Sequence, residues 1–535
     1  MRSGDWITLH VDGVRYFDKP PLPYWLMASV FHAAAPEPFA ARLVPALAAV
    51  ACASLTAWLG VRLGGARVGL IAGLMTAANL GFFLYGRIVK PDTLFILCLF
   101  LAWAGFVLAW FGRGRLVLAL FWAGLGLAAI AKDVVGALAP LAIAALFFGL
   151  VGERRWRDFV PWWGLGVFAV LALPWHLLVE RRNPGFFWYT IVDNHLLNFM
   201  RQRRFPDEDV TLGALEFLAV TAAAFLPWLL AVPWAVGQAF RDRHGLATER
   251  LWALFALWPL VLVAFFTLSP FKLPHYGLPA VPALALLAAR TWDASIARAP
   301  DAPGPRALLV PIVVLFAAGA VALAAAWAGA LPLPDDVLDA VDLASRNRAA
   351  QGLGSGPSPF VTWRPVIGTT ALLLGGGALA LAVAAWRRAG SAGVALALAV
   401  VLGFLPLAGR GMADFARLRS VAPLAAGLAT RVHPGEVVAH EGPIENAASL
   451  LLTLRAPLRI VDGLQSNLAF GATFAEARDV FWDGARLRAA WTGAARCYLV
   501  TSRGPEGSVT ATLPPERLHL LARNGTRRLY SNLAD

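Results

Sequence analysis

Lysine is rare in this sequence, so the positions that keep it are the first chemical signal to consider. The chain has 46 Lys and Arg residues, and only four are lysine: Lys19, Lys90, Lys132 and Lys272. An ammonium group is a compact point charge that suits a phosphate or pyrophosphate. The lysine positions therefore indicate a phosphate site, with ordinary snorkelling of long side chains at helix ends as the alternative.

The segment from Tyr16 to Leu26 holds the first of these lysines. It reads Tyr-Phe-Asp-Lys-Pro-Pro-Leu-Pro-Tyr-Trp-Leu. Each proline fixes its own φ and favours an extended residue before it, and aromatic residues favour the membrane interface. We therefore expect Lys19 to be held at the depth of lipid headgroups. A structural elbow with interfacial aromatic residues is the alternative.

A second charged segment lies between two apolar runs. Arg87, Lys90 and Asp92 place two cations and one carboxylate where one predicted span ends and the next begins. An ionisable residue at the end of a transmembrane helix that faces a cavity is a functional hypothesis. The structural alternative is that Asp92 caps a helix N-terminus.

A third segment, 269–279, is a proline-rich entry into a later span. Irregular backbone at membrane depth is tolerated where it lines a cavity or is buried in protein. Lys272, His275 and Tyr276 would then lie near the same face of the membrane as the other lysines. The alternative is a kinked helix start with an interfacial tyrosine.

The long loop 180–211 combines Asp193-Asn194-His195 with a basic stretch. Its cations are Arg201, Arg203 and Arg204. This pattern fits a basic interfacial helix that faces anionic headgroups, and a solvated face is the alternative for any single arginine.

The composition of the chain is that of a polytopic membrane protein. Of its 535 residues, 59% are hydrophobic and 15% charged, whereas a soluble domain carries roughly 25% charged residues. This excludes an ordinary soluble, disordered or fibrous protein. The net charge of +13 lies mostly in short loops, which argues against nucleic acid binding. The three cysteines are far apart, which excludes a disulfide framework or a cysteine-based zinc site. No cluster of metal-ligating residues in the sequence requires a divalent metal, although the sequence leaves open a divalent metal near Asp92.

Apolar runs of about 20 residues predict about twelve membrane-spanning helices. Lys132-Asp133 separates two of them by a tight turn. The predicted spans are 39–60, 66–85, 92–112, 115–131, 134–151, 159–179, 212–238, 251–269, 274–290, 307–330, 366–386 and 390–409.

Arginine-rich short loops fix the predicted orientation, because positive loops stay in the cytoplasm. These loops are 61–65, 113–114, 152–158, 239–250, 291–306 and 387–389. Residues 1–38, the long loops 180–211 and 331–365, and everything after 410 are then outside, with a flexible loop tip at 351–358. All four lysines fall on this outer face.

The hydropathy falls after residue 410, where a different organisation is expected. Residues 411–432 fit an amphipathic helix on the membrane surface. Residues 433–535 read as a small α/β domain, with strands at 436–440, 458–461 and 497–501, helical stretches at 444–455 and 474–490, and a hairpin turn at Asn524-Gly525. We expect the domains to be the outer-face loop 1–38, the transmembrane domain 39–410, the interfacial helix 411–432 and this small domain.

The N-terminal segment raises a question of topology. Residues 1–38 are predicted outside, yet they contain no signal peptide. We expect that one transmembrane helix is missing before Met1, either because the start codon is misplaced or because the protein is a natural truncation.

The motifs resemble those of a known family. Gly4-Asp5-Trp6 followed by the 13–26 segment resembles the first outer loop of the ArnT-like, dolichyl-phosphate-mannose mannosyltransferase-related enzymes. Gly86-Arg87 with Asp92, and residues 271–279 (Phe-Lys-Leu-Pro-His-Tyr-Gly-Leu-Pro), resemble later motifs of that family. The resemblance covers the membrane part and the small C-terminal domain.

The resemblance implies a GT-C fold and a bacterial inner-membrane glycosyltransferase of the pentosyl- or hexosyltransferase class. Such enzymes move a sugar from a polyprenyl-phosphate donor, such as undecaprenyl phosphate, to lipid A, protein or another glycan on the outer, periplasmic face. The resemblance assigns Lys19 and Asp92 to the catalytic framing of the donor phosphate. It assigns the remaining substrate contacts to Tyr16, Arg87, Lys90, Lys272, His275 and Tyr276.

Two departures from the family pattern accompany the resemblance. The acidic pair and Arg-Tyr that precede Gly-Asp-Trp in the family are absent, so its principal carboxylate would lie upstream of Met1. Lys132 is followed by Asp133 where the family pattern has glycine.

Two other readings stay open, and the missing carboxylate would allow the first of them. One is a non-catalytic relative that acts in assembly or sensing. The other is a transporter or flippase, against which stand the lack of an inverted repeat and of an acidic residue in the middle of a span.

Overall fold

Long apolar helices make up the larger part of the chain. The structure is a computed structural model that describes residues 4–205, 210–331, 360–454 and 456–534. Within these residues, eight helices are long and apolar enough to cross a membrane, or nine if one bent pair counts as a single span. The eight are α2 (Pro38–Gly64), α5 (Asp92–Trp110), α7 (Val134–Val151), α9 (Trp162–Arg182), α12 (Ala247–Leu268), α14 (Pro305–Ala328), α17 (Phe360–Trp386) and α18 (Gly390–Arg419).

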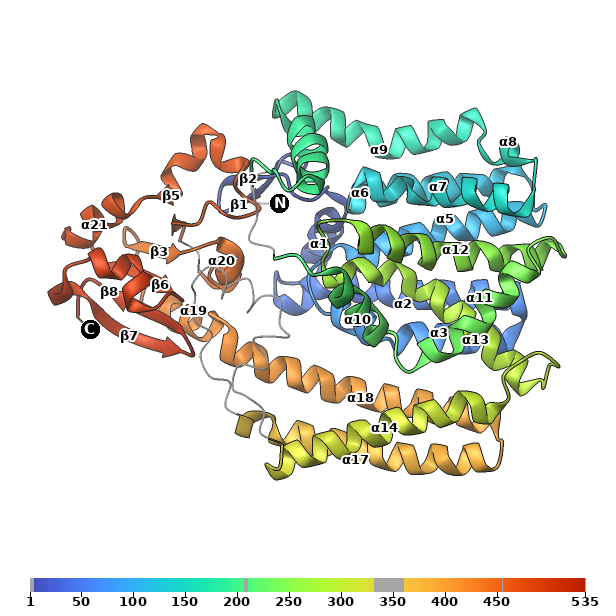
Figure 1. The fold of residues 1–535 in the computed structure, drawn as a ribbon. Helices are drawn as coiled ribbons and strands as arrows, with labels where there is room; N and C mark the ends of the chain where they lie inside the picture. Colours follow the sequence, from blue (N-terminus) through green and yellow to red (C-terminus); the bar gives the residue numbers. More distant parts are fainter. Residues whose placement is uncertain (1–3, 206–209, 332–359, 455, 535) are drawn as a thin grey trace.

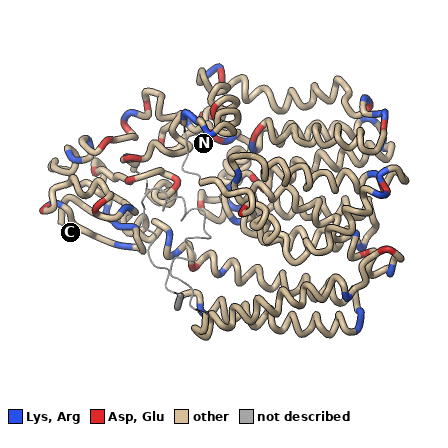
Figure 2. The backbone as a smooth tube through the Cα atoms, in the orientation of Figure 1, with Lys and Arg blue, Asp and Glu red and all other residues tan. Residues whose placement is uncertain are grey.

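The helices run between two chemically different ends of the bundle. A small C-terminal domain lies against one end, which we call the domain-side end (Figure 1). The short arginine-rich loops lie at the opposite end, the arginine end, and Figure 2 shows that charged residues gather at both ends and leave the middle of the helices nearly free. The predicted alternation of the loops is thus confirmed, and all four lysines lie in connections at the domain-side end.

The turn predicted between residues 131 and 134 is confirmed. Helix α6 (Leu118–Ala131), which follows the short 3-10 turn η1 (Arg115–Val117), ends at Lys132, and α7 starts after Asp133. The Asp133 carboxylate accepts a hydrogen bond from the backbone N–H of Gly136 and so caps α7. This cap fixes the turn at the domain-side end of the bundle.

Two predicted spans are wrong as continuous helices. Span 66–85 is divided into α3 (Ala66–Ala77) and α4 (Leu80–Tyr85), and 212–238 is a helix pair bent by 90°. Asn79 links the two breaks, because its side-chain oxygen accepts a hydrogen bond from Phe82 N and its amide donates to Ala224 O at 2.7 Å. The bent pair consists of α10 (Ala214–Ala224), η3 (Trp228–Ala231) and α11 (Val232–Arg241).

The predicted span 274–290 also differs from a regular helix. It starts as the 3-10 segment η4 (Pro274–Ala280) and becomes the α-helix α13 (Val281–Ile296) only afterwards. Prolines at 274, 279 and 282 remove backbone donors, so the regular i→i−4 ladder cannot begin earlier. The irregular entry predicted from the sequence is therefore confirmed, and it lies at the domain-side end.

The predicted helix 411–432 is divided between two helices. Helix α18 continues through Arg419, and α19 (Ala422–Ala429) follows after a break at Ser420. Leu424 and Leu428 of α19 are buried in the core of the C-terminal domain. The break arises because α19 packs on this domain rather than continuing the long helix.

The C-terminal domain contains a six-stranded sheet in the order β5-β4-β3-β6-β8-β7. Strands β3 to β6 are parallel, and β7 and β8 are antiparallel. The predicted hairpin is confirmed, since Asn524 pairs with Arg527 and Gly525 has a φ of +60°. The elements are β3 (Val437–Glu441), α20 (Ala448–Thr453), β4 (Leu458–Val461), β5 (Phe481–Trp482), α21 (Gly484–Thr492), β6 (Cys497–Thr501), β7 (His519–Asn524) and β8 (Arg527–Ser531). The predicted loop tip at 351–358 lies outside the described residues.

The N-terminal segment is tied to this domain. It forms a hairpin, β1 (Leu9–Val11) and β2 (Val14–Tyr16), followed by α1 (Leu22–Ala33). Val14 is fully buried in the same apolar core as the C-terminal sheet. The Asp12 carboxylate accepts a hydrogen bond from Leu458 N at 3.0 Å, and Arg15 pairs with Glu476. The first and last parts of the chain thus form one unit at the domain-side end (Figure 1).

An aromatic cluster continues this unit down to the helices. Phe17 packs with Phe186 and Phe470, and the ring of Tyr189 stacks on Phe470 with centroids 4.6 Å apart. Such pairs add about 0.5–1.5 kcal/mol beyond the area they bury. The position of Lys19, two residues after Phe17, therefore depends on contacts made by the C-terminal domain.

Candidate functional site

A buried ion pair lies at the start of α5. Asp92 is 3% exposed, and its Oδ1 lies 2.6 Å from Lys132 Nζ and 3.7 Å from His275 Nε2. The three residues come from α5, from the turn between α6 and α7, and from η4. A carboxylate removed from water in this way needs its cationic partners, so Asp92 and Lys132 hold each other in place.

Aromatic rings enclose Lys132 and His275. Lys132 Nζ lies 5.7 Å from the ring centroid of Phe95 and 5.4 Å from that of Tyr276. His275 packs on Tyr85 and Tyr276, with centroids 5.3 and 4.9 Å away. These surroundings keep the local dielectric low, which strengthens the effect of a fixed charge on an anion placed nearby.

Lys19 lies on the proline-braced segment predicted from the sequence. Its Nζ is 2.5 Å from Asp18 Oδ2. Burial alone would lower the pKa of this ammonium group, but Asp18 outweighs that cost and holds the pKa above its ordinary value. Tyr276 and Tyr24 also lie within electrostatic reach of Lys19. Tyr276 is thus shared by Lys19 and Lys132, so the two lysines border one constellation.

Tyr16 lies next to Lys19 in the same fold. Its hydroxyl is 3.3 Å from that of Tyr24. Burial raises the pKa of Tyr16 well above its ordinary value, so this phenol stays neutral and can donate a hydrogen bond.

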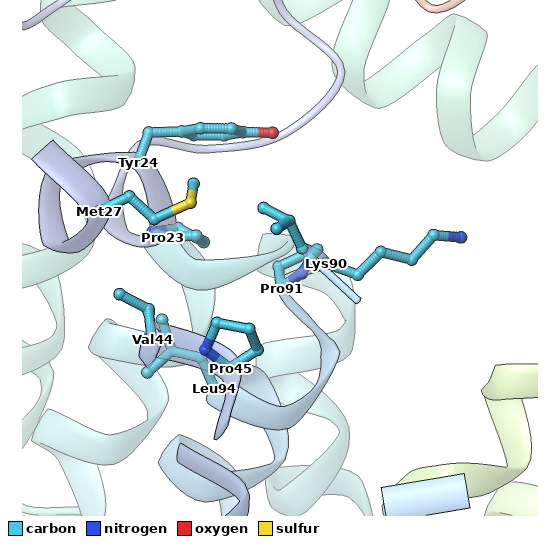
Figure 3. A pocket seen from close by; sticks show the side chains of 9 residues that line it. Pro23, Tyr24, Met27, Val44, Pro45, Lys90, Pro91 and Leu94 are labelled. Atoms are coloured by element: carbon cyan, nitrogen blue, oxygen red, sulfur yellow. The ribbon is translucent and has the colours of Figure 1, made fainter. Parts of the chain in front are cut away.

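Lys90 lies at the rim of an apolar pocket between α1, α2 and the start of α5. Pro23, Met27, Pro45 and Leu94 line this pocket, and the Lys90 side chain points away from them (Figure 3). Its ammonium group is exposed and lies within electrostatic reach of Asp92 and His275. Lys90 therefore adds positive charge at the entrance of the constellation.

Two other predicted residues lie apart from this constellation. The exposed Arg87 stacks over the Phe83 ring at 3.5 Å and donates a hydrogen bond to Phe83 O. Lys272 is 5% exposed, and Thr211 and Leu212 bind its backbone. The structure thus groups Lys19, Asp92, His275 and Tyr276, with Lys90 at the edge.

The sequence patterns missed the pairing of Lys132 with Asp92 and the contact of the neighbouring Asp133 with His195. Lys132 was predicted as a turn residue and as one of four lysines suited to a phosphate, without a partner, and Asp133 was noted in the turn and as a departure from the family pattern. Asp133 Oδ1 faces His195 Nε2 at 3.7 Å, and His195 lies on the π-helix η2 (Trp188–Leu197). A cation and an acid at a tight turn beside the site were the available signal.

The loop 180–211 is helical in its middle, but by π-type rather than α-type hydrogen bonds. The carboxylate of Asp193, which is fully buried, accepts hydrogen bonds from the backbone N–H groups of Arg204 and Phe205. The side chain of Arg203 pairs with it at 3.5 Å. Asp193 thus folds the basic end of this loop back towards the helix.

The residues of the site do not fit a resident divalent metal. Within the described residues, no group of three or more His, Cys, Asp or Glu side chains converges in a way that could hold a metal ion. Asp92, the carboxylate near which a metal was considered, already has Lys132 at 2.6 Å.

The chain resembles known membrane transferases in sequence. Residues 18–177 match the family model described as dolichyl-phosphate-mannose-protein mannosyltransferase. Undecaprenyl phosphate-alpha-4-amino-4-deoxy-L-arabinose arabinosyl transferase from Pseudomonas paraeruginosa is 32% identical over 308 residues, which cover 54% of this chain and 52% of that protein. The protein of the same name from Edwardsiella ictaluri is 27% identical over 304 residues. The alignments thus span about half the length of the curated relatives.

The fold has a match among solved structures. ArnT from Cupriavidus metallidurans bound to undecaprenyl phosphate superposes with a TM-score of 0.79 at 22% identity, covering 100% of this chain and 91% of that one. The apo form of the same protein also gives 0.79. The resemblance drawn from the motifs is therefore confirmed: the chain has the membrane-helical fold of ArnT and is similar in sequence to the ArnT-like transferases.

Proposed function

We propose that this chain is an integral membrane glycosyltransferase that moves a sugar from a polyprenyl-phosphate donor to a lipid A-type or other cell-envelope acceptor. The buried Asp92–Lys132–His275 group beside Lys19, at the domain-side end of the bundle, is the observation that carries the proposal. The names of its sequence relatives support undecaprenyl phosphate as the carrier and an amino-pentose as the sugar.

The chemistry follows from charge. The bond between the sugar C1 and the donor phosphate oxygen breaks, and the electron pair leaves with the phosphate. An acceptor oxygen forms the new bond to C1, and its proton passes to solvent. Negative charge develops on the leaving phosphate, and fixed cations in a site of low dielectric stabilise it strongly. Lys19 and Lys132 supply these cations, Tyr16 donates a hydrogen bond, and Asp92 holds Lys132 and His275 in position.

We also propose that the domain-side end faces the periplasm of a bacterial inner membrane. The arginine end then lies in the cytoplasm, as the bias of short positive loops requires. All three native cysteines are buried. A thiol-reactive label is therefore expected to react mainly with a single cysteine introduced at the surface. A membrane-impermeant maleimide is expected to label Gly507→Cys from the periplasm and Arg154→Cys only after the inner membrane is opened. The reverse pattern would overturn the proposed orientation.

A transfer assay tests the activity. The full chain in lipid nanodiscs receives undecaprenyl-phosphate 4-amino-4-deoxy-L-arabinose and lipid A, and glycosylated lipid A is measured by mass spectrometry. Lys19→Gln is expected to lower kcat/KM by about 100-fold or more, the size typical of one lost charge-stabilising contact. Arg387→Gln, which lies at the arginine end, is the control and should leave the rate unchanged.

The other outcomes of this assay separate the alternatives. Binding of undecaprenyl phosphate with no product from any donor would support a non-catalytic relative. Movement of labelled lipid across the membrane without cleavage of the sugar bond would support a flippase. Either result would overturn the proposed transferase activity.

A further inference from the structure

The histidine on the π-helix has an oxygen atom near each of its ring nitrogens. His195 Nδ1 lies 2.6 Å from the carbonyl oxygen of Thr190, so this nitrogen carries a proton. The other nitrogen, Nε2, faces the Asp133 carboxylate at 3.7 Å. A neutral ring would direct a lone pair at that carboxylate, whereas an imidazolium satisfies both neighbours. The geometry therefore favours the charged form of His195.

The charged groups around this pair agree with that reading. Burial disfavours the imidazolium, but the nearby Asp133 carboxylate raises the pKa of His195, and His195 in turn contributes to lowering the pKa of Asp133. Lys19 lies within electrostatic reach of His195 and opposes its protonation. The charge of Lys132 contributes to lowering the pKa of Asp133, as the charge of His195 does. Asp133 is thus attracted by two cations, His195 and Lys132.

Lys132 has in turn two carboxylates within its surroundings. One is Asp92, at 2.6 Å. The other belongs to Asp133, its neighbour in the chain, which also caps α7. A lysine ammonium group that lies near two carboxylates is attracted to both of them, unless another cation neutralises one. His195 is the cation that can neutralise Asp133.

We propose that His195 is a positioning residue that, as an imidazolium, holds Asp133 away from Lys132 and so keeps Lys132 on Asp92. Deprotonation of His195, or its loss, frees Asp133 to compete for the Lys132 ammonium and loosens the Asp92–Lys132 pair. The π-helix that carries His195 is thereby coupled to the site, in keeping with the frequent occurrence of π-turns at functional sites. The activity arm of the test rests on the proposed function; the spectroscopic arm does not.

A double-mutant cycle tests the competition. His195→Asn keeps a donor for Thr190 O but removes the group that faces Asp133, and Asp133→Asn removes the competing charge while preserving a good helix cap. In the transfer assay at pH 7, His195→Asn is expected to lower kcat at least tenfold with little change in KM. Asp133→Asn and the double variant are both expected to stay within threefold of the unmodified chain. A double variant as slow as His195→Asn alone would overturn the proposal.

The pH profile adds a readout that a merely structural role would not move. The unmodified chain should lose activity as the pH rises through the pKa of His195. Asp133→Asn should lack this limb, because no free carboxylate is then left to compete for Lys132. An identical limb in both proteins would contradict the proposal.

A spectroscopic measurement decides the proposal even if no transfer is found. With only four lysines in the chain, selective 15N labelling gives four side-chain ammonium signals, and Lys132→Arg assigns the one of interest. The Lys132 signal is expected to shift in His195→Asn and to return in the double variant. A signal that is the same in all of these proteins would show that Lys132 does not sense His195, and the proposal would fail independently of the activity.

Discussion

Replacing Lys132 with alanine is expected to destabilise the protein by about 3–5 kcal/mol, because it leaves Asp92 as a buried charge without its closest partner. The same change should lower transfer by about 1,000-fold, because the site loses a fixed cation. Thermal unfolding of the purified protein and the transfer assay measure the two effects.

A second substitution separates stability from activity in this experiment. Adding Asp92→Asn to Lys132→Ala removes the uncompensated charge, so most of the lost stability should return. The transfer rate should stay low, because the cation is still missing. If Lys132→Ala alone were as stable as the unmodified chain, the ion pair would have to be far better solvated than its burial indicates.

The second large effect on transfer is expected from a substitution at a glycine that lies far from the ion pair. Gly471 begins the 3-10 turn η6 (Gly471–Thr473) of the C-terminal domain, and a Cβ added there would clash with the Arg15 carbonyl oxygen. Both groups near the contact are backbone, so the hairpin and the domain must separate. Overpacking of this kind typically costs about 1–3 kcal/mol. Gly471→Ala is therefore expected to undock the N-terminal hairpin and lower transfer about 100-fold through displacement of Lys19.

Hydrogen exchange of residues 9–16 measures this undocking directly. These amides should lose protection in Gly471→Ala, while those of the long helices keep theirs. Gly484→Ala is the matched control, since nothing lies within 4 Å of its added Cβ and alanine suits the start of a helix. Unchanged protection in Gly471→Ala would contradict the close contact described for Arg15.

Local patterns were enough to place most helices and strands, because hydropathy and turn chemistry act over a few residues. The turn at Lys132-Asp133 and the Asn524-Gly525 hairpin are examples. The breaks at Asn79 and in 212–238 could not be predicted, because a side chain 145 positions away from Ala224 makes the hydrogen bond that links them. Hydropathy alone describes both stretches as continuous apolar runs.

The sequence indicated which residues belong to the site better than it indicated which of them pair with each other. Lys19, Asp92, His275 and Tyr276 stood out by residue type and by the prolines around them. The bond of Asp92 to Lys132 joins residues 40 positions apart, and the contact of Asp133 with His195 joins two separate connections of the bundle. Such pairings depend on helix packing, which no single segment encodes. For the same reason Arg87, although adjacent in sequence to the site, packs against Phe83 instead.

The shared core of Val14 with the C-terminal sheet has a consequence for biogenesis. The strand that bears Val14 is made before the membrane helices described above, whereas its partners in the core are made after them. Contacts of such large sequence separation form late in folding. The membrane helices can therefore insert one after another before the C-terminal domain is present to hold the segment that carries Lys19. A nascent chain halted before β3 would have these helices embedded in the bilayer and still lack an assembled site, so the proposed activity would appear only after the C-terminal domain has been made.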